Sequence, residues 1–293
     1  MDQAQQLRNI INLSNQKVNK VARVITITSG KGGVGKSNSA VNLAIQLKRM
    51  GKRVIIFDAD FGLANIEIMF GAVPKYNLSD LIYRGKNIKE ILTLGPEGIG
   101  FISGGSGIME NINLNKTQID ILVRNLAELD ELADYIIIDT GAGISDAVLE
   151  FVLVSKEIIL VITPEPTSVT DAYSLLKVLN HNPRFNHKET EIKVMSNKAN
   201  SYQEGMDSYN KISAVVTKFL KLNITLLGVI PNDDNVSKSI IRQMPVSILY
   251  SFSKASYAYE NIAKSLENEA NTHESRRGIA KMITELLRMK VLG

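Results

Sequence analysis

Ser29–Ser37 reads SGKGGVGKS, and this stretch decides the fold. It follows an apolar run, Val24–Thr28, that predicts a strand, and it opens a segment of helical length, Ser37–Met50. Glycines between a strand and a helix let the backbone wrap closely around a phosphate, and the loop amides with the helix N-terminus form a nest for an anion. The sequence therefore predicts a phosphate-binding P-loop, against the alternative of a glycine-rich turn that binds nothing.

The side chains of this loop predict a nucleotide together with a divalent cation. Lys36 is expected to reach the outer phosphates, and the Ser37 hydroxyl is expected to ligate Mg²⁺. Every residue of the motif is a candidate for contact with the nucleotide, namely Gly30, Lys31, Gly32, Gly33, Val34, Gly35, Lys36 and Ser37.

Carboxylates end two further predicted strands. The run Tyr135–Asp139 contains three isoleucines before its aspartate, which is the Walker B arrangement, so Asp139 is expected to hold Mg²⁺, through water. The run Arg53–Phe57 leads directly into Asp58 and Asp60. An aspartate at a strand end is often only a turn residue, but after a P-loop at these positions the functional interpretation is favoured.

Short β-branched runs alternate with segments of helical length along the whole chain. This pattern predicts a three-layer α/β fold, in which a mostly parallel, twisted sheet is flanked by helices and the strand C-termini share the ligand-binding edge. We expect one P-loop domain at 21–270, preceded by a short segment (1–20) and followed by a helix (276–292). The other expected strands are Gly100–Ser103, Glu157–Ile162, Glu191–Ser196 and Leu226–Ile230, and the other expected helices are Lys116–Leu132, Ser168–His181 and Tyr209–Lys221.

Composition and charge exclude several classes of function. The chain has no cysteine, which removes disulfides, thiolate metal sites and iron–sulfur clusters. The net charge is +4, but residues 1–23 and 273–293 each carry a net +3, so the body between them sums to −2. A slightly acidic body disfavours a specific nucleic-acid surface, and basic ends favour contacts with anionic or partner surfaces. The polar start lacks a signal-peptide core, so we expect a cytoplasmic protein.

The second lysine of the loop, Lys31, makes this a deviant form of the motif, and GKGGVGKS resembles the MinD/ParA family of ATPases. The resemblance implies that two subunits dimerise with ATP and that Lys31 reaches the partner's phosphates, much as an arginine finger does. It also implies that Asp60 positions the attacking water, that Asp58 lies near the metal, and that Thr140–Gly143 senses the γ-phosphate.

The same resemblance implies where the adenine binds. In the family, two loops that follow strands flank the base, and an asparagine amide can pair with its edge. The matching positions here are Asn197, Pro231, Asn232 and Asp233. Both loops are also ordinary turn sequences.

The C-terminal segment 276–292 carries an apolar stripe at helical spacing, made of Ile279, Met282, Ile283, Leu286 and Leu287. Basic residues flank the stripe, which fits a helix lying on an anionic membrane surface. The alternative is a helix that packs on the body of the protein. Members of the MinD branch end in a membrane-targeting helix, so the resemblance favours peripheral binding to the inner face of the cell membrane in the ATP state.

The N-terminal segment begins with DQAQQLR, which resembles the activator motif of the flagellar-number regulators (FlhG, also called FleN or YlxH) within the MinD/ParA family. The resemblance covers essentially the whole chain. It implies that Asp2, Gln3, Leu7 and Arg8 stimulate a flagellar GTPase of the signal-recognition-particle type (FlhF-like), and that the ATPase restricts flagellar number, with basal-body proteins as further candidate partners. The alternatives are a septum-site-determining MinD ATPase and a ParA-type DNA-partition ATPase.

Overall fold

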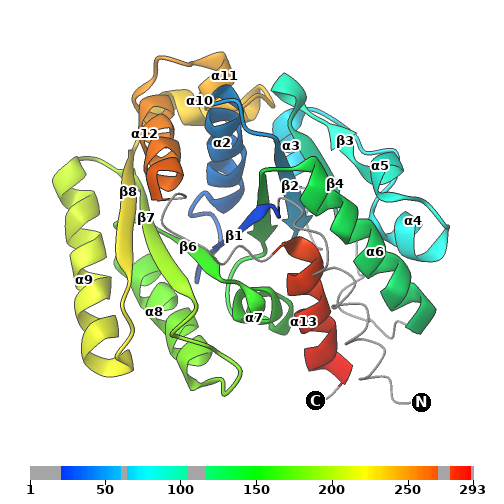
Figure 1. The fold of residues 1–293 in the computed structure, drawn as a ribbon. Coiled ribbons are helices and arrows are strands. Elements are labelled where there is room, and N and C mark those ends of the chain that lie inside the picture. The colour runs from blue at the N-terminus through cyan, green and yellow to red at the C-terminus, as the bar shows by residue number, and fades with distance from the viewer. Residues whose placement is uncertain (1–20, 61–64, 105–115, 270–277, 292–293) are drawn as a thin grey trace.

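The computed structural model describes residues 21–60, 65–104, 116–269 and 278–291. Within these residues the strands form one eight-stranded sheet in the order β3-β4-β2-β5-β1-β6-β7-β8 (Figure 1). The strands are β1 Arg23–Thr28, β2 Val54–Ala59, β3 Thr93–Leu94, β4 Gly100–Ser103, β5 Tyr135–Thr140, β6 Glu157–Ile162, β7 Glu191–Ala199 and β8 Thr225–Pro231. All pairs are parallel except β3 with β4, so the predicted fold class is confirmed.

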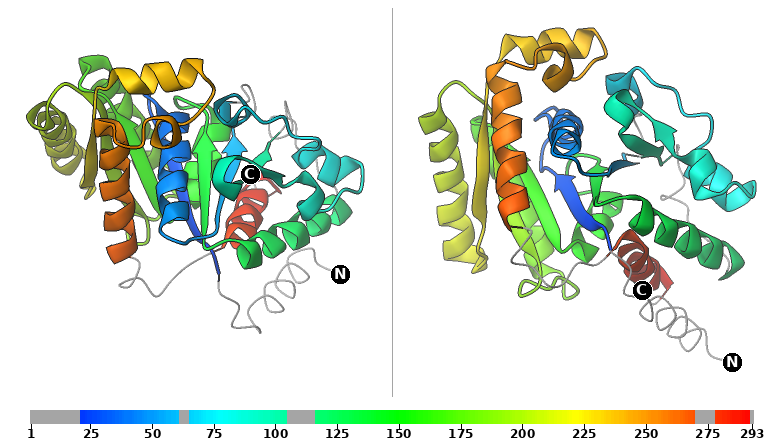
Figure 2. Two further views of the ribbon diagram at one scale, coloured as in Figure 1. Left: turned by 90° about the horizontal axis from the view of Figure 1, so that it is seen from above. Right: turned by 45° about the horizontal axis from the view of Figure 1, so that its top comes forward.

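The helices form a layer on each side of this sheet, as Figures 1 and 2 show. One layer holds α2 (Lys36–Arg49), α3 (Asn65–Phe70) and α12 (Lys254–Glu269), with α10 (Asp234–Ile241) and α11 (Val246–Leu249) outside it. The other layer holds α6 (Lys116–Leu132), α7 (Asp146–Val154), α8 (Pro166–His181), α9 (Tyr202–Leu220) and α13 (Ile279–Val291). The short helices α4 (Leu78–Tyr83) and α5 (Ile88–Ile91) lie beside β3, and the 3₁₀ turn Pro96–Gly98 precedes β4.

The expected strands and helices agree closely with the structure where burial is continuous. Gly100–Ser103, Glu157–Ile162 and Lys116–Leu132 have the expected bounds. The central strands β5 and β6 are buried at every position, because helices cover both faces of the sheet. The two-residue strand β3 and the helices α3, α4, α5 and α11 were not expected from the sequence, because a helix of four to six residues has fewer than two turns in which a helical periodicity can be recognised.

The apolar stripe of α13 lies against the protein in this structure. Its five residues are buried to 0–4% exposure, and they belong to the apolar core that α6 and α7 form with one face of the sheet. The sequence left two alternatives for this stripe, contact with a membrane surface and packing on the body of the protein. In this structure the stripe packs on the body of the protein. Direct contact of these side chains with lipid requires α13 to leave its place. No described helix combines the length and the apolar character needed to cross a bilayer.

The start of α13 is held by a carboxylate from another helix. Asp130, near the end of α6, accepts hydrogen bonds from the amides of Ile279 (2.9 Å) and Ala280 (3.3 Å). Gly278 makes this approach possible, because a Cβ there would lie 2.1 Å from the Asp130 carboxylate. Burial raises the pKa of Asp130 to about 6, although both amides oppose the shift. Asp130 therefore caps a helix that is distant in the sequence.

Candidate nucleotide site

The P-loop follows β1 and enters α2 at the edge of the sheet where the strands end. Gly35 adopts φ 97°, in the left-handed region, and precedes the first residue of α2. A Cβ on Gly30 would lie 2.2 Å from the carbonyl group of Asp171 on α8, so only glycine fits at this position. The lysine of the motif, Lys36, is 8% exposed, and burial lowers its pKa while Asp139 and Asp60 oppose the shift. The P-loop thus packs against α8 and leads into a buried ammonium group, that of Lys36.

The C-terminal end of β7 contacts the P-loop. The Asn197 amide donates to the Val34 carbonyl at 2.8 Å, and the Lys198 ammonium donates to the Gly33 carbonyl at 2.8 Å. The sequence had assigned Asn197 to the adenine. Here the amide is 6% exposed and already bonded at both ends, because its oxygen accepts from the Lys198 amide. An adenine contact by Asn197 stays a prediction, whereas its contact with the P-loop is observed.

The second predicted base-binding loop lies next to the first. Pro231 ends β8 and pairs with Ala199 of β7, and the Asn232 amide donates to the Ala199 carbonyl at 2.7 Å. The Asp233 carboxylate accepts from the amides of Asn235 (2.9 Å) and Ala255 (3.1 Å). It therefore caps α10 and binds the start of α12, so its observed contacts are structural. Contact of these loops with a base stays a prediction.

Two carboxylates lie side by side beneath the P-loop. Asp58 on β2 and Asp139 on β5 are register partners in the sheet, with exposures of 2% and 0%. Burial raises the pKa of Asp58 to about 8, with Asp139 adding to the effect. Burial also raises the pKa of Asp139 to about 7, opposed by the Ser37 hydroxyl and by Lys36. Because both pKa values are raised, each of these adjacent buried carboxyl groups requires either a bound proton or a nearby cation.

The residues present fit Mg²⁺. The Ser37 hydroxyl lies near enough to Asp139 to oppose the shift of its pKa, but neither carboxylate oxygen makes a hydrogen bond of normal geometry with the described residues. A buried carboxylate in that state is unfavourable unless something positive binds it. Asp58 differs, because its oxygens accept from the amides of Asp60 (3.0 Å) and Ile66 (3.5 Å). Asp139 and Ser37 are therefore the better-placed ligands, and Asp58, whose oxygens are already bonded to amides, would act as an orienting carboxylate near the metal.

Asp60 lies at the mouth of the same site. Its carboxylate accepts from the Asn65 amide at 3.2 Å, and it lies next to Gly141, where a Cβ would be 3.7 Å from the carboxylate oxygen. Gly141 belongs to the predicted second switch, whose Gly143 amide donates to the Ser29 carbonyl at 2.9 Å. The structure thus brings both predicted switches to the P-loop. Residues 61–64 of the first switch lie outside the described part.

Lys31 has partners that the sequence did not predict. Its ammonium bonds to the Glu165 carboxylate at 2.6 Å and to the Thr167 hydroxyl at 2.8 Å, both at the start of α8. The ion pair is open to solvent, and Lys31 lowers the pKa of Glu165. Glu165 follows β6, and β6 is the neighbour of β1 in the sheet. The contact with Lys31 could therefore be predicted only by a reader who knew the strand order.

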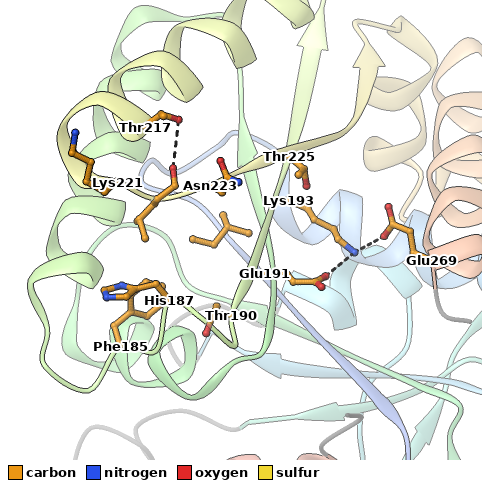
Figure 3. A pocket seen from close by; sticks show the side chains of 12 residues that line it. Phe185, His187, Thr190, Glu191, Lys193, Thr217, Lys221, Asn223, Thr225 and Glu269 are labelled. Carbon is orange, nitrogen blue, oxygen red and sulfur yellow. Dashed lines mark hydrogen bonds and ion pairs between the residues drawn. The ribbon is translucent and has the colours of Figure 1, made fainter. Parts of the chain in front are cut away.

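A separate pocket of about 760 Å³ lies at the opposite edge of the sheet, where β7 and β8 begin (Figure 3). Phe185, Ile192 and Leu222 give it apolar walls. Its lysine, Lys193, is already paired with three carboxylates, including Glu157 at 2.9 Å. Because the P-loop follows the C-terminal end of β1, this pocket is not part of the nucleotide site. Asp2, Gln3, Leu7 and Arg8 lie outside the described residues.

Comparison with known proteins shows that one family shares the sequence of this chain. Residues 20–267 match the family described as ParA, NUBPL iron-transfer P-loop NTPase. The chain is 39% identical over 246 residues to the antiactivator FleN of Pseudomonas aeruginosa, covering 84% of this chain and 86% of that protein. It is 34% identical to the flagellum site-determining protein YlxH of Helicobacter pylori, with 84% and 83% covered.

A solved structure is similar over the same range. The septum site-determining protein MinD of Pyrococcus horikoshii, complexed with Mg-ADP, superposes with a TM-score of 0.65. The match covers 86% of this chain and 98% of the other at 22% identity, which shows a common fold.

Proposed function

The chain belongs to the ParA/MinD family of P-loop NTPases and is an ATPase, and within that family we propose that it is a nucleotide-dependent switch that regulates flagellar number or placement. The observation that carries the proposal is the 39% identity to an antiactivator named FleN over 84% of the chain. The similarity to the flagellum site-determining protein YlxH supports the same branch. An iron-transfer role is not proposed, because iron–sulfur clusters are held by cysteine thiolates and the chain has none.

ATP with Mg²⁺ is the ligand that the site residues fit. Lys36 and the loop amides would hold the phosphates, while Ser37 and Asp139 would hold the cation, which neutralises negative charge on the phosphates when bound. Asp60 would orient the attacking water, because its carboxylate lies beside Gly141 of the second switch. The buried, unpartnered carboxylate of Asp139 is the structural support for this assignment.

The switch would operate through dimerisation. Lys31 bonds to Glu165 and Thr167 of its own chain in this structure. To act on a partner's phosphates, it must exchange these contacts for contacts across the dimer. Breaking the contacts within the chain requires little free energy, because an exposed ion pair contributes only about 0–1 kcal/mol to stability. Slow hydrolysis by the isolated subunit is therefore expected.

The flagellar partner would be a GTPase of the signal-recognition-particle type, contacted by Asp2, Gln3, Leu7 and Arg8. The test is GTP hydrolysis by that purified GTPase in the presence of the full chain, of a chain lacking residues 1–20, and of an Arg8→Ala variant. An Asn9→Ala variant serves as the matched control. Stimulation that survives deletion of the segment would refute the role of these four residues, and no stimulation by the full chain would refute the partner and favour a septum-site MinD function.

Binding to an anionic membrane through α13 is the remaining part of the proposal, and it requires undocking. An engineered disulfide tests it, because the chain has no cysteine of its own. A Cβ at Gly278 would lie 2.3 Å from the Asp130 Cγ, so the two Cβ atoms are within the ~3.8 Å typical of disulfides. In the double variant Asp130→Cys/Gly278→Cys, oxidation should keep α13 docked and abolish its contribution to vesicle binding in ATP, and reduction should restore it. Equal binding in both states would contradict a role for α13.

A further inference from the structure

Apolar side chains are exposed at the end of α10 and in the two turns that flank α11. Ile241 is 82% exposed and Phe252 is 84% exposed, while Ile240 and Met244 are 45% and 40% exposed. Phe252 lies in the turn between α11 and α12, and α11 contacts both α10 and α12. We call Ile240, Ile241, Met244 and Phe252 the α10–α11 ridge. Figure 2 shows its helices on the outside of the α2–α12 layer, away from α13.

Cations flank the ridge residues in the sequence. Lys238, Arg242 and Lys254 are all exposed, and none forms an ion pair with another residue in the described part of the chain. Residues 234–258 contain these three cations and one acidic residue, Asp234, which gives a local net charge of +2. The basic character is local, because residues 24–272 as a whole sum to −2. An apolar ridge with unpaired cations needs an explanation that packing does not supply.

We propose that the α10–α11 ridge is a membrane-contact surface for anionic lipid, separate from α13. Side chains that are four-fifths exposed project as single tips, which suit the headgroup–acyl boundary, whereas a docked protein helix requires an apolar groove. Lys238, Arg242 and Lys254 would lie near lipid phosphates while Ile241 and Phe252 enter the boundary. The ridge and α13 are two weak signals, and stable peripheral anchoring usually takes two.

The position of the ridge connects it to the nucleotide site. Asp233, in the loop after β8, caps α10 and also bonds to the start of α12. The ridge also lies near α3. Gly71 directly follows α3, and a Cβ on Gly71 would lie 3.5 Å from the carbonyl oxygen of Gln243. The ridge is therefore held between a predicted base-binding loop and the helix that follows the first switch. This inference does not depend on the flagellar role or on undocking of α13.

A single tryptophan gives a direct test, because the chain has none. Phe252→Trp in the full chain is mixed with phosphatidylglycerol–phosphatidylcholine vesicles, and its emission is compared with that of Phe219→Trp. Phe219 is a matched control, since it is 62% exposed and lies on α9 in the opposite helix layer. The Phe252→Trp emission should shift to the blue and be quenched by brominated lipid, and the control should do neither. An unshifted Phe252→Trp in vesicles that sediment the protein would overturn the proposal.

Co-sedimentation separates this surface from α13 and from a protein interface. Ile241→Ser/Phe252→Ser and Lys238→Gln/Arg242→Gln should each weaken binding to the anionic vesicles by about tenfold or more. Lys218→Gln/Phe219→Ser should not. Binding through the ridge should persist in oxidised Asp130→Cys/Gly278→Cys, so failure of the α13 proposal leaves this one intact. Unchanged vesicle binding together with loss of ATP-dependent dimers would assign the ridge to a subunit interface and refute the lipid surface.

Discussion

Replacing Asp139 by asparagine should stabilise the protein without nucleotide while removing its response to Mg²⁺–ATP. Asp139 is wholly buried with both oxygens unpartnered, and burial raises its pKa from 3.8 to about 7. The folded state therefore holds the proton more tightly than the unfolded state does. This contribution is fully present below the unfolded pKa of 3.8 and is lost as the pH rises through about 7.

The magnitude follows from the shift. A rise of about 3 units corresponds to about 4 kcal/mol at 1.36 kcal/mol per unit, once the pH exceeds the folded pKa. Asparagine has nearly the same shape and no charge, so at about pH 8.5 the nucleotide-free variant should gain up to about 4 kcal/mol in free energy of unfolding. Asp58, whose pKa is raised to about 8, stays in place and preserves part of the pH dependence.

Urea denaturation across the range of pH 5–9 measures both quantities, with and without Mg²⁺–ATP. The wild-type protein should lose stability as the pH rises and regain it with the nucleotide, and Asp139→Asn should show a flatter profile and little gain. Asp146→Asn is the control, because Asp146 is exposed at the start of α7 and its loss should change stability by about 1 kcal/mol at most. A nucleotide-free Asp139→Asn that is no more stable than wild type at alkaline pH would refute the reasoning.

Three further outcomes follow from the same geometry. Lys31→Ala should keep the free energy of unfolding within about 1 kcal/mol of the wild-type value, since the ion pair of Lys31 with Glu165 is exposed. Its rate of phosphate release should fall at least about a hundredfold. Normal hydrolysis would argue against a role of Lys31 in trans. Gly30→Ala should cost about 1–3 kcal/mol in thermal denaturation through its clash with α8, whereas Gly32→Ala, whose nearest neighbour is 3.9 Å away, should cost far less. Leu286→Ala should weaken docking of α13 by about 2–5 kcal/mol and speed hydrogen exchange in α13 and α6, and an unchanged exchange pattern would contradict its packing.

The P-loop was predictable because its information is local. Glycines, a lysine and a serine at fixed spacing between a strand and a helix specify a loop conformation almost independently of the rest of the chain. Asp58 and Asp139 could each be placed at the end of a strand from local sequence. Their adjacency could not, because it depends on β5 inserting between β2 and β1 in the sheet. The raised pKa of Asp58 follows from burial and from that adjacency, and the raised pKa of Asp139 follows from burial, so both are properties of the assembled fold.

The contacts of Lys31 and of Asn197 were missed for the same physical reason. Glu165 meets Lys31 because β6 neighbours β1, and Asn197 meets the P-loop because β7 lies next in the sheet. Neither residue has a distinctive local pattern. Polar residues that follow parallel strands gather at one edge, but the order of the strands decides which of them touch.

The two candidate membrane elements show the limit of periodicity. A repeat of 3.6 residues in α13 establishes that one face is apolar, but lipid and a protein core satisfy such a face equally well, and here α6 and α7 cover it. The α10–α11 ridge has no such repeat, because Ile240 and Ile241 are consecutive and Phe252 comes from a turn. Its exposure depends on how α10, α11 and the start of α12 pack together, which the tertiary structure alone shows. An amphipathic pattern thus identifies a face that must be covered, and only the tertiary structure identifies a face that is left uncovered.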